Sequence, residues 1–304
     1  MIFDDKNIRI ASGWRDYELL DASGGERLER WGDVLLVRPD PQVLWDTPRE
    51  LPEWKNYDAR YLRSSTGGGH WETRRPVKQS WSISYRELIF KISPTGFKHT
   101  GLFPEQAVNW DMMDGLIRAR LNSGKPVSVL NLFAYTGGAT LACAAAGASV
   151  CHVDAAKGMV AWARESCALS GLADRPIRWI VDDCGKFIER EIRRGRRYDA
   201  IIMDPPSYGR GPGGEIWKLE NNIFEFMQLA CGALSDDPLF VLINSYTTGL
   251  SPSVMAYLLG STVGRSHGGR VCASEIALPV RATGMALPCG GSALWTSEEQ
   301  YPWN

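Results

Sequence analysis

The spacing of apolar residues divides the chain into two parts. In residues 1–97, apolar and polar residues alternate in short segments between turns rich in Gly, Pro and Asp, which is typical of β-hairpins. The expected strands lie at residues 17–21, 28–31, 34–38, 81–85 and 88–93. Thr47–Lys78 is rich in Gly, Pro, Trp and charge, so we expect an irregular connection there, with Ser64–Gly69 mobile. The pattern predicts a small β-rich N-terminal domain over residues 1–97.

In residues 98–304, apolar runs alternate with helical stretches, which indicates repeated βα units and a mainly parallel sheet. Strands are expected at residues 127–134, 149–154, 177–181, 198–203 and 239–245. Helices are expected at residues 138–148, 156–170, 186–194, 216–234 and 251–263, the last with Ser251 as N-cap and Pro252 at its first position. The tail breaks the alternation, because residues 271–279 and 292–295 predict two strands with no helix between them. The second domain is therefore expected to be an α/β fold that ends in a hairpin.

Four loops follow the first four of these strands at one edge of the sheet, the carboxyl edge, where open α/β sheets bind ligands. The glycines of the Tyr135–Gly138 turn let a ligand approach the backbone. Asp154 follows the second strand, about where a carboxylate accepts hydrogen bonds from ribose hydroxyls. Asp182 and Asp183 follow the third strand, where a carboxylate can accept from an adenine amino group. The fourth loop is an Asp-Pro-Pro-Ser-Tyr turn, Asp204–Tyr208.

Each of these signals also has a purely structural interpretation. A double glycine allows tight strand–helix packing, Asp154 can cap a helix, and Asp-Pro-Pro can be a stiff turn. Their order and spacing nevertheless favour a nucleotide-like ligand. The first strand is followed by Tyr135–Gly138 and not by the G-x-G-x-x-G fingerprint of NAD sites, and the sequence contains no G-x-x-x-x-G-K-[ST] loop of ATP sites. S-adenosylmethionine is therefore the predicted cofactor, and methyl transfer the predicted reaction.

At these residues the chain resembles bacterial large-subunit ribosomal RNA methyltransferases and their uncharacterised relatives. The motifs that carry the resemblance are Leu130–Gly138, Val153-Asp154, Asp182-Asp183, Asp204–Tyr208 and His99–Gln106, the last similar to a Lys-Thr-Gly-aromatic segment of that family. The resemblance covers roughly residues 80 to 250. It implies a class I, Rossmann-like methyltransferase domain with a mainly parallel seven-stranded sheet. The predicted C-terminal hairpin agrees with the antiparallel last strand of that fold.

The resemblance also implies which residues contact S-adenosylmethionine. Thr100, Phe103 and Gln106 would help to enclose the cofactor, while Asp154 and Asp183 would bind its ribose and adenine. The full set of expected contacts is Thr100, Phe103, Gln106, Phe133, Ala134, Tyr135, Thr136, Gly137, Asp154, Ala155, Asp182, Asp183, Cys184 and Asp204. Where the family segment continues with Arg after Gln, this chain has Ala107, so that contact does not carry over.

The acceptor of the methyl group is predicted to lie at the Asp-Pro-Pro turn. Methyl transfer from a sulfonium to a lone pair needs in-line positioning and exclusion of water more than acid–base help. We expect Asp204 and the carbonyl of Pro205 to accept hydrogen bonds from a planar amino or ring nitrogen. Tyr208 is expected to stack on the acceptor, and Asn244 to add a polar contact from the turn after the fifth strand. The alternative for Tyr208 is simple packing.

Gly209–Gly214 is expected to form a mobile flap over the acceptor, with Arg210 available for a phosphate; an ordinary surface loop is the alternative.

Thiol chemistry is disfavoured at the acceptor. Family members that methylate carbon 5 of cytosine carry a nucleophilic Cys after the fifth strand, whereas this chain has Asn244-Ser-Tyr-Thr-Thr248. Carbon-5 methylation needs covalent addition to the ring, so a nitrogen acceptor is favoured. Cys289, just before the last predicted strand, could face the crevice. The favoured interpretation of Cys289 and of Cys184 is a small buried residue.

Composition limits the class of protein. Of the 304 residues, 44% are hydrophobic and 23% charged, as in ordinary globular proteins, and no apolar run has the length of a membrane span. The N-terminus lacks the features of a signal peptide. Seven scattered cysteines without a Cys-x-x-Cys pair predict reduced thiols and a cytoplasmic location. Four dispersed histidines predict no metal site.

Charge bears on the partner. The net charge is −1, whereas dedicated nucleic-acid binders are usually basic, so a local basic patch would have to supply phosphate contacts. The candidates are Arg190–Arg197 and the cluster of Arg74, Arg75 and Lys78; a solvated helix end and a solvated loop are the favoured interpretations.

The leading hypothesis is an enzyme that methylates a base nitrogen of RNA, with ribosomal RNA as one candidate substrate. The alternatives are an N-methyltransferase of a protein side chain or small molecule, and a cofactor-binding module without catalysis. The oligomeric state is not predicted.

Overall fold

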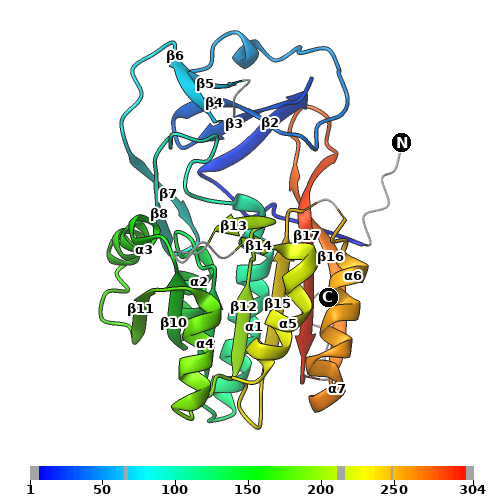
Figure 1. The fold of residues 1–304 in the computed structure, drawn as a ribbon. Helices are drawn as coiled ribbons and strands as arrows, with labels where there is room; N and C mark the ends of the chain where they lie inside the picture. Colours follow the sequence, from blue (N-terminus) through cyan, green and yellow to red (C-terminus); the bar gives the residue numbers. More distant parts are fainter. Residues whose placement is uncertain (1–6, 65–67, 211–215, 248, 299–304) are drawn as a thin grey trace. The chain divides into compact units, whose positions relative to one another are not determined.

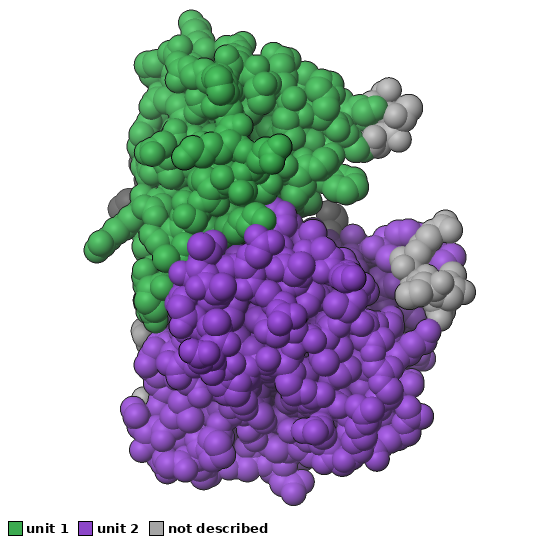
Figure 2. Space-filling view, turned by 90° about the vertical axis from the view of Figure 1, so that its left-hand side faces the viewer, with its two compact units in different colours: residues 1–108, 276–289 green, residues 109–275, 290–304 purple. Residues whose placement is uncertain are grey.

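The computed structural model of the protein describes residues 7–64, 68–210, 216–247 and 249–298. The chain forms two compact units, coloured separately in Figure 2. Unit 1 comprises residues 1–108 and 276–289, and unit 2 comprises residues 109–275 and 290–304. The predicted boundary after residue 97 falls within unit 1. Most of the predicted Gly209–Gly214 flap, the centre of Ser64–Gly69 and Thr248 lie outside the described residues.

Unit 1 contains a five-stranded sheet in the order β2-β3-β4-β5-β6 and a separate hairpin, β7–β8. The elements are β1 (Ile8–Ile10), β2 (Tyr17–Ser23), β3 (Glu26–Trp31), β4 (Val34–Pro39), η1 (Pro52–Trp54), β5 (Ala59–Arg63), β6 (Gly69–Thr73), β7 (Trp81–Tyr85), β8 (Leu88–Ile92) and η2 (Pro104–Gln106). The five predicted strands of this region are confirmed. The irregular connection expected over Thr47–Lys78 is wrong at β5 and β6. Ala59 and Tyr61 are buried while Arg60 and Leu62 are half-buried, so a period-two pattern lies between the Gly- and Pro-rich segments.

The sheet of unit 1 encloses charged side chains. The carboxylate of Glu29 is fully buried and accepts hydrogen bonds from Arg38 Nε at 2.6 Å, Arg38 Nη2 at 2.7 Å and the Tyr17 hydroxyl at 2.8 Å. Burial alone would raise the pKa of this carboxyl, but Arg27 and Arg38 outweigh it and hold the pKa at about 2. Glu29 is therefore a buried carboxylate that stays ionised because it is paired.

Unit 2 is an α/β structure built on a mainly parallel sheet (Figure 1). Its strands are β9 (Ser128–Leu132), β10 (Ser149–Asp154), β11 (Ile177–Val181), β12 (Ala200–Met203), β13 (Tyr208–Arg210), β14 (Ile216–Lys218), β15 (Phe240–Ser245), β16 (Arg270–Pro279) and β17 (Ala286–Thr296), the last two continuing into unit 1. Its helices are α1 (Ala107–Asn122), α2 (Gly138–Ala146), α3 (Lys157–Leu169), α4 (Cys184–Arg193), α5 (Leu219–Cys231), α6 (Pro252–Ser261) and α7 (Val263–His267).

The predicted fold class is confirmed. Within the described residues the sheet has eight strands in the order β1-β16-β17-β15-β12-β9-β10-β11, one more than predicted because β1 joins β16. Strands β9, β10, β11, β12 and β15 run parallel, and β17 pairs antiparallel with β15. Ser251 caps α6 as expected, since its side chain accepts a hydrogen bond from the amide of Val254.

Two element predictions are wrong in residues 98–304. Ile216–Lys218, expected to begin a helix, instead pairs as β14 with β13, and α5 begins only at Leu219. Cys289, expected just before the last strand, lies inside that strand, because β17 begins at Ala286. Both segments carry apolar residues, and the pairing partner rather than the local sequence determines which element forms.

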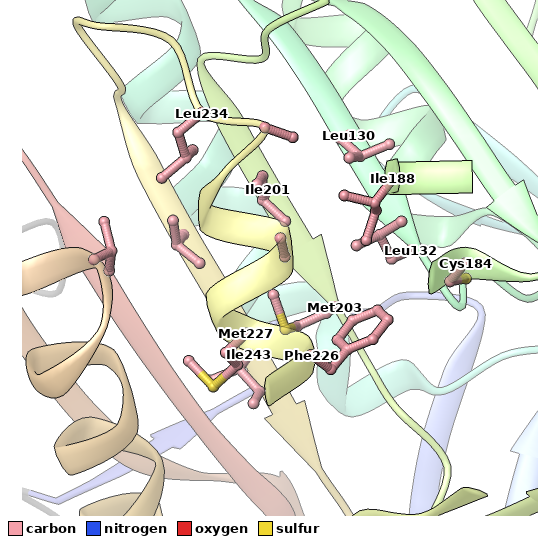
Figure 3. Close-up of a cluster of buried hydrophobic side chains, with 14 of the residues drawn as sticks. Leu130, Leu132, Cys184, Ile188, Ile201, Met203, Phe226, Met227, Leu234 and Ile243 are labelled. Carbon is pink, nitrogen blue, oxygen red and sulfur yellow. The ribbon is translucent and has the colours of Figure 1, made fainter. Parts of the chain in front are cut away.

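One face of the sheet packs against α4, α5 and α6, which lie in front of the strands in Figure 1. Helix α1 lies behind the strands in the same view. Figure 3 shows this core: side chains from three neighbouring strands face Ile188 of α4 and Phe226 and Met227 of α5. The strand residues drawn there include Leu130, Leu132, Ile201, Met203 and Ile243, all buried. This packing fixes the level at which each strand ends, and therefore where each loop of the carboxyl edge begins.

Candidate active site

The register of the strands aligns the predicted site residues in one row. Met203 pairs with Leu132 on one side and with Ile243 on the other. The next residues, Asp204, Phe133 and Asn244, are therefore neighbours across adjacent strands, which lie about 4.8 Å apart. Val153 also pairs with Leu132, so Asp154 continues the row, and its own partner Val181 precedes Asp182. The structure thus brings the four predicted loops together at one edge.

The turn after β9 has an unusual backbone. Phe133 and Tyr135 have positive φ values of 54° and 50°, and Gly137 has φ of 84°. The left-handed region is uncommon for aromatic residues and costs about 1–3 kcal/mol for each. Such a conformation persists only where the surroundings hold it, and it is frequent at ligand sites.

The two glycines of this turn are explained by packing. A Cβ on Gly137 would lie 2.9 Å from Cβ of Ala163 in α3, and one on Gly138 would lie 2.7 Å from the ring of Trp110 in α1. The structural interpretation of the double glycine is therefore correct. It does not compete with ligand binding, because close packing of α2 is what places the turn at the sheet edge.

Asp154 holds the turn in place. Its Oδ2 accepts a hydrogen bond from the amide of Tyr135 at 2.8 Å, and its Oδ1 accepts one from the amide of Ala156 at 2.8 Å. Each carboxylate oxygen keeps a further lone pair for an external donor. Asp154 is not the N-cap of α3, whose N-cap is Ala156. Ala155, another predicted contact, is exposed at the same edge.

Cys184 connects three loops. The amide of Phe133 donates to its sulfur at 3.4 Å, and the thiol lies 3.9 Å from the carbonyl of Val153. The amide of Ala134 donates to the same carbonyl at 3.1 Å. Burial raises the pKa of the Cys184 thiol to about 12. Cys184 is thus a buried structural residue, as favoured from the sequence. Its sulfur contacts the backbone of the turn after β9, Phe133–Gly138, which we call the cofactor turn.

The two acidic residues after β11 have different environments. Asp182 accepts from the amide of Asp183 and forms an ion pair with Arg190. Asp183 is the N-cap of α4, and its Oδ1 accepts from the amide of Lys186 at 2.9 Å. Its Oδ2 has no protein donor in the described part of the chain. Of the pair, Asp183 is therefore the better acceptor for an adenine amino group.

These residues fit S-adenosylmethionine in the chemistry of their polar groups. Asp154 and Asp183 offer acceptors for ribose hydroxyls and an adenine amino group. Among the described residues no side chain caps the amino end of α2, so its first amides suit the methionine carboxylate. Thr136 and Gly137 are buried in the turn that leads from β9 into α2.

Trp217 is a residue of this site that the sequence did not reveal. Its indole Nε1 donates to the carbonyl of Pro206 at 2.6 Å, and its ring centroid lies 5.8 Å from that of Phe133. The amide of Leu219 donates to the carbonyl of Ser207 at 3.1 Å. The β13–β14 hairpin therefore fixes the Asp-Pro-Pro turn to the cofactor turn. The sequence signal for this strand is the alternation in Ile216-Trp-Lys218, which falls at the start of the helix predicted over residues 216–234.

Tyr208 and Trp217 lie on opposite faces of this hairpin. Tyr208 pairs with Lys218, and Gly209 pairs with Trp217, so the two aromatic side chains point in opposite directions. The side chain of Tyr208 is 51% exposed. Its stacking on an acceptor stays a prediction, as do the acceptor roles of Asp204, which is half-buried, and of Pro205, which is buried.

Asn244 lies inside β15, within the predicted strand 239–245, and not in the turn after it from which its contact was expected. It is 3% exposed, and its Oδ1 accepts from Asn109 Nδ2 at 3.0 Å and from the Ser292 hydroxyl at 2.9 Å. These bonds connect β15 to α1 and β17. The geometry favours a supporting role for Asn244 behind the row.

The remaining predicted contacts lie in unit 1. Gln106 is the last residue of the short helix η2, and Phe103 is the N-cap of that helix. Thr100 is fully buried, and its hydroxyl has no hydrogen-bond partner among the described residues. Their contact with the cofactor stays a prediction. Cys289 also belongs to unit 1; it is buried, its thiol donates to the carbonyl of Leu287, and burial raises its pKa well above the usual value.

The basic candidates are partly neutralised within the protein. Arg190 pairs with Asp182, and Arg194 approaches Glu191 at 3.5 Å. In unit 1, Arg75 pairs with Asp58 at 3.5 Å and Arg74 stacks on Tyr57. Within the ranges described, no cluster of three or more His, Cys, Asp or Glu is placed to hold a metal ion. None of the described helices combines the length and apolarity needed to cross a membrane.

A parallel sheet with an antiparallel last strand, a glycine turn and a row of carboxylates at its carboxyl edge defines the class I methyltransferases. The sequence profile of S-adenosylmethionine-dependent methyltransferases matches residues 54–216, more than half of the chain. The protein belongs to this family, and S-adenosylmethionine is its cofactor.

Solved structures agree. A SAM-dependent methyltransferase from Agrobacterium tumefaciens is 36% identical, with a TM-score of 0.89 over 96% of this chain and 93% of that chain. A structure described as a putative methyltransferase complexed with SAH (S-adenosylhomocysteine) has a TM-score of 0.72 over 94% of this chain and 76% of that chain. Because its sequence identity is only 18%, this likeness supports the fold alone.

Curated relatives include the ribosomal RNA large subunit methyltransferase K/L of Shewanella frigidimarina, 32% identical over 140 residues, which are 45% of this chain and 18% of that protein. The K/L enzyme of Colwellia psychrerythraea is 31% identical over 143 residues, covering 47% and 19%. The chain thus spans about a fifth of the length of these relatives.

Proposed function

We propose that the protein transfers the methyl group of S-adenosylmethionine to a nitrogen atom of an RNA base, with ribosomal RNA as the candidate substrate. The observation that carries the proposal is the position of the Asp-Pro-Pro turn. Its Asp204 continues the row next to Phe133, the first strained residue of the cofactor turn. An acceptor held by Asp204 would therefore lie beside the cofactor.

The chemistry of this position suits a neutral nitrogen. The bound cofactor supplies an electrophilic methyl group on a sulfonium. Asp204 and the carbonyl of Pro205 are acceptors, so they orient an N–H group and leave its lone pair free to attack. Asp204 is also the nearest base in the row for the proton that N-methylation releases. Ser207 and Pro206 are held by the hairpin that carries Trp217, which limits movement of the turn.

The end of the fifth strand carries no cysteine, which supports a nitrogen rather than a carbon atom as the methyl acceptor. The sequence from Phe240 to Thr248, which covers the end of the fifth strand, has no cysteine. Cys184 is engaged between loops and holds its proton, with a pKa of about 12. A pyrimidine carbon would need a nucleophile to activate the ring.

The choice of RNA is supported by the K/L relatives, whose printed name assigns them to large-subunit ribosomal RNA. Their matching segments have the length of the cofactor domain rather than of the whole enzyme, so the substrate comes to this chain by proposal. A cytoplasmic location is consistent with seven cysteines that are all free.

The test is transfer of a tritiated methyl group from S-adenosylmethionine. Purified protein is incubated separately with total RNA, protein and small metabolites from a strain that lacks the gene. We expect label in RNA, and chromatography of the digested nucleosides should assign it to an N-methylated base. Label in protein alone, or in a carbon-methylated base, would contradict the proposal. No transfer to any pool, with normal SAH binding, would favour a non-catalytic module.

A further inference from the structure

A groove of about 460 Å³ opens at the opposite end of the same strands. Its lining includes Ser128, Ser149 and Ile177, which are the first residues of β9, β10 and β11. The groove therefore lies at the amino edge of the sheet, whereas the cofactor row lies at the carboxyl edge. Its volume is within the range of small-ligand sites.

The lining is strongly basic. It includes Arg175, Arg178, Arg196 and Arg197, and no Asp or Glu among the described residues that form it. These arginines come from two different loops and one strand: Arg175 precedes β11, Arg178 lies in β11, and the other two follow α4. In a chain with a net charge of −1, this is a local excess of positive charge created by the fold.

Two of the four arginines are anchored. Arg178 Nη1 donates to Glu191 Oε2 at 2.8 Å, and Arg196 approaches the same carboxylate at 3.9 Å. The Tyr198 hydroxyl donates to Glu191 at 2.6 Å. Burial opposes the charge on Glu191, but the hydrogen bonds from Arg178 and Tyr198 outweigh it and lower its pKa. One buried carboxylate thus fixes one wall of the groove.

The other two arginines have no such partner. Neither Arg175 nor Arg197 has a carboxylate within ion-pair distance in the described part of the chain, and Arg197 Nη1 donates only to the carbonyl of Arg196. Both residues are exposed. A guanidinium with unused donors beside anchored ones is suited to bind phosphate oxygens in a bidentate manner.

We propose that this groove binds a phosphate group, and that in the working enzyme this is a backbone phosphodiester of the RNA substrate. The second part rests on the proposed function; the first part does not. β10 has six residues, so its two ends are about 17 Å apart at roughly 3.4 Å per residue. The phosphate bound here therefore belongs to a nucleotide several positions away from the methylated base. The groove would favour RNA long enough to reach both edges of the sheet, and it would contact the RNA backbone rather than the base.

The experiment measures binding of a fluorescein-labelled 30-nucleotide RNA by anisotropy at several salt concentrations. The variant is R175Q/R197Q, which removes two charges from the groove. The matched control is R265Q/R270Q, which removes two exposed arginines of unit 2 that do not line the groove. SAH binding and the melting temperature, measured for both variants, verify that the fold and the cofactor site are intact.

We expect R175Q/R197Q to weaken RNA binding about tenfold and to reduce the slope of log K against log salt by about 0.7, the contribution of one single-strand phosphate contact. R175K/R197K should restore the slope, because lysine keeps the charge. An equal effect of the groove variant and the control would overturn the proposal.

Titration with inorganic pyrophosphate separates the two sources of phosphate. Binding to the wild type that R175Q/R197Q abolishes, without any groove-dependent RNA binding, would support the phosphate site and overturn its assignment to RNA. Groove-dependent RNA binding without methyl transfer to RNA would contradict the proposed function while supporting the groove.

Discussion

The two edges of the sheet in unit 2 carry opposite charge. The carboxyl edge presents Asp154, Asp183 and Asp204, with Asp182 neutralised by Arg190. The amino edge presents four arginines around a groove, with Glu191 buried between two of them. The same strands join the two edges. A nearly neutral chain therefore contains an acidic site and a basic site, and the average charge conceals both.

The difference shows how each edge is built. At the carboxyl edge the strands end in register, so single residues after each strand form a row. At the amino edge, charges from loops of different length gather around one carboxylate. An acidic row suits a sulfonium and amino groups, and an arginine groove suits phosphate. The following predictions test this division.

The largest effect is expected at Asp204. D204A should lower methyl transfer by at least about 100-fold, because an oriented acceptor group is lost, while the Kd for SAH stays unchanged. The measurement combines transfer of labelled methyl groups with calorimetry of SAH. D236A, which changes an exposed aspartate outside the row, serves as control and should keep full activity. Loss of SAH binding in D204A would instead place Asp204 at the cofactor.

D154A should weaken SAH binding by about 10- to 100-fold, the value of charge-assisted hydrogen bonds. The loss is expected to have two parts, because Asp154 is the predicted acceptor for the ribose hydroxyls and also holds the strained amide of Tyr135. D154N retains one acceptor oxygen and should bind better than D154A. Calorimetry checks both variants, and unchanged affinity in D154A would remove Asp154 from the site.

His152 lies between the two edges, in the middle of β10. Burial lowers its pKa from about 6.5 to about 3, so it stays neutral in the folded protein and becomes charged only on unfolding. The unfolded state therefore binds more protons below pH 6.5, and stability falls as the pH drops. From pH 7 to 5 the loss is about 2 kcal/mol for this one group.

Urea denaturation at pH 7 and pH 5 measures this loss. His99, in unit 1, has a pKa of about 4, lowered by burial and by Arg38, and adds a loss of the same sign. H152N, which keeps a polar atom near the Thr140 hydroxyl that His152 Nδ1 contacts at 2.9 Å, should reduce the pH dependence. The same pH dependence in H152N and the wild type would show that His152 contributes none of it.

The smallest effect is expected at Trp217. W217F keeps an aromatic ring beside Phe133 but removes the donor to Pro206, so kcat should fall about fivefold, corresponding to about 1 kcal/mol, with SAH binding unchanged. W217A also removes the ring contact and should have a larger effect. If both variants retain wild-type kcat, the hairpin does not position the acceptor turn.

Much of unit 2 could be predicted from the sequence, because its strands are continuous apolar runs followed by acidic or glycine-rich turns. Asp154 and Asp204 were found because they follow such runs directly. Trp217 was not, because a three-residue strand has too few positions to show its period, and the strand that pairs with it is equally short. The arginine groove could not be found either, since Arg175 and Arg197 are brought together only by folding. The run Arg190–Arg197 is evident in the sequence, but the sequence does not tell which of its members pair with carboxylates of the same chain.

Cys184 has a consequence for chemical probes of the enzyme. The thiol nearest the cofactor turn has a pKa of about 12, so only about one molecule in 100,000 carries the reactive thiolate at neutral pH. Alkylating reagents should therefore leave the native protein active for a long time. Cys184 would react only when the loops that enclose it open, and the rate of its labelling would then report how often the cofactor turn separates from the rest of the sheet edge.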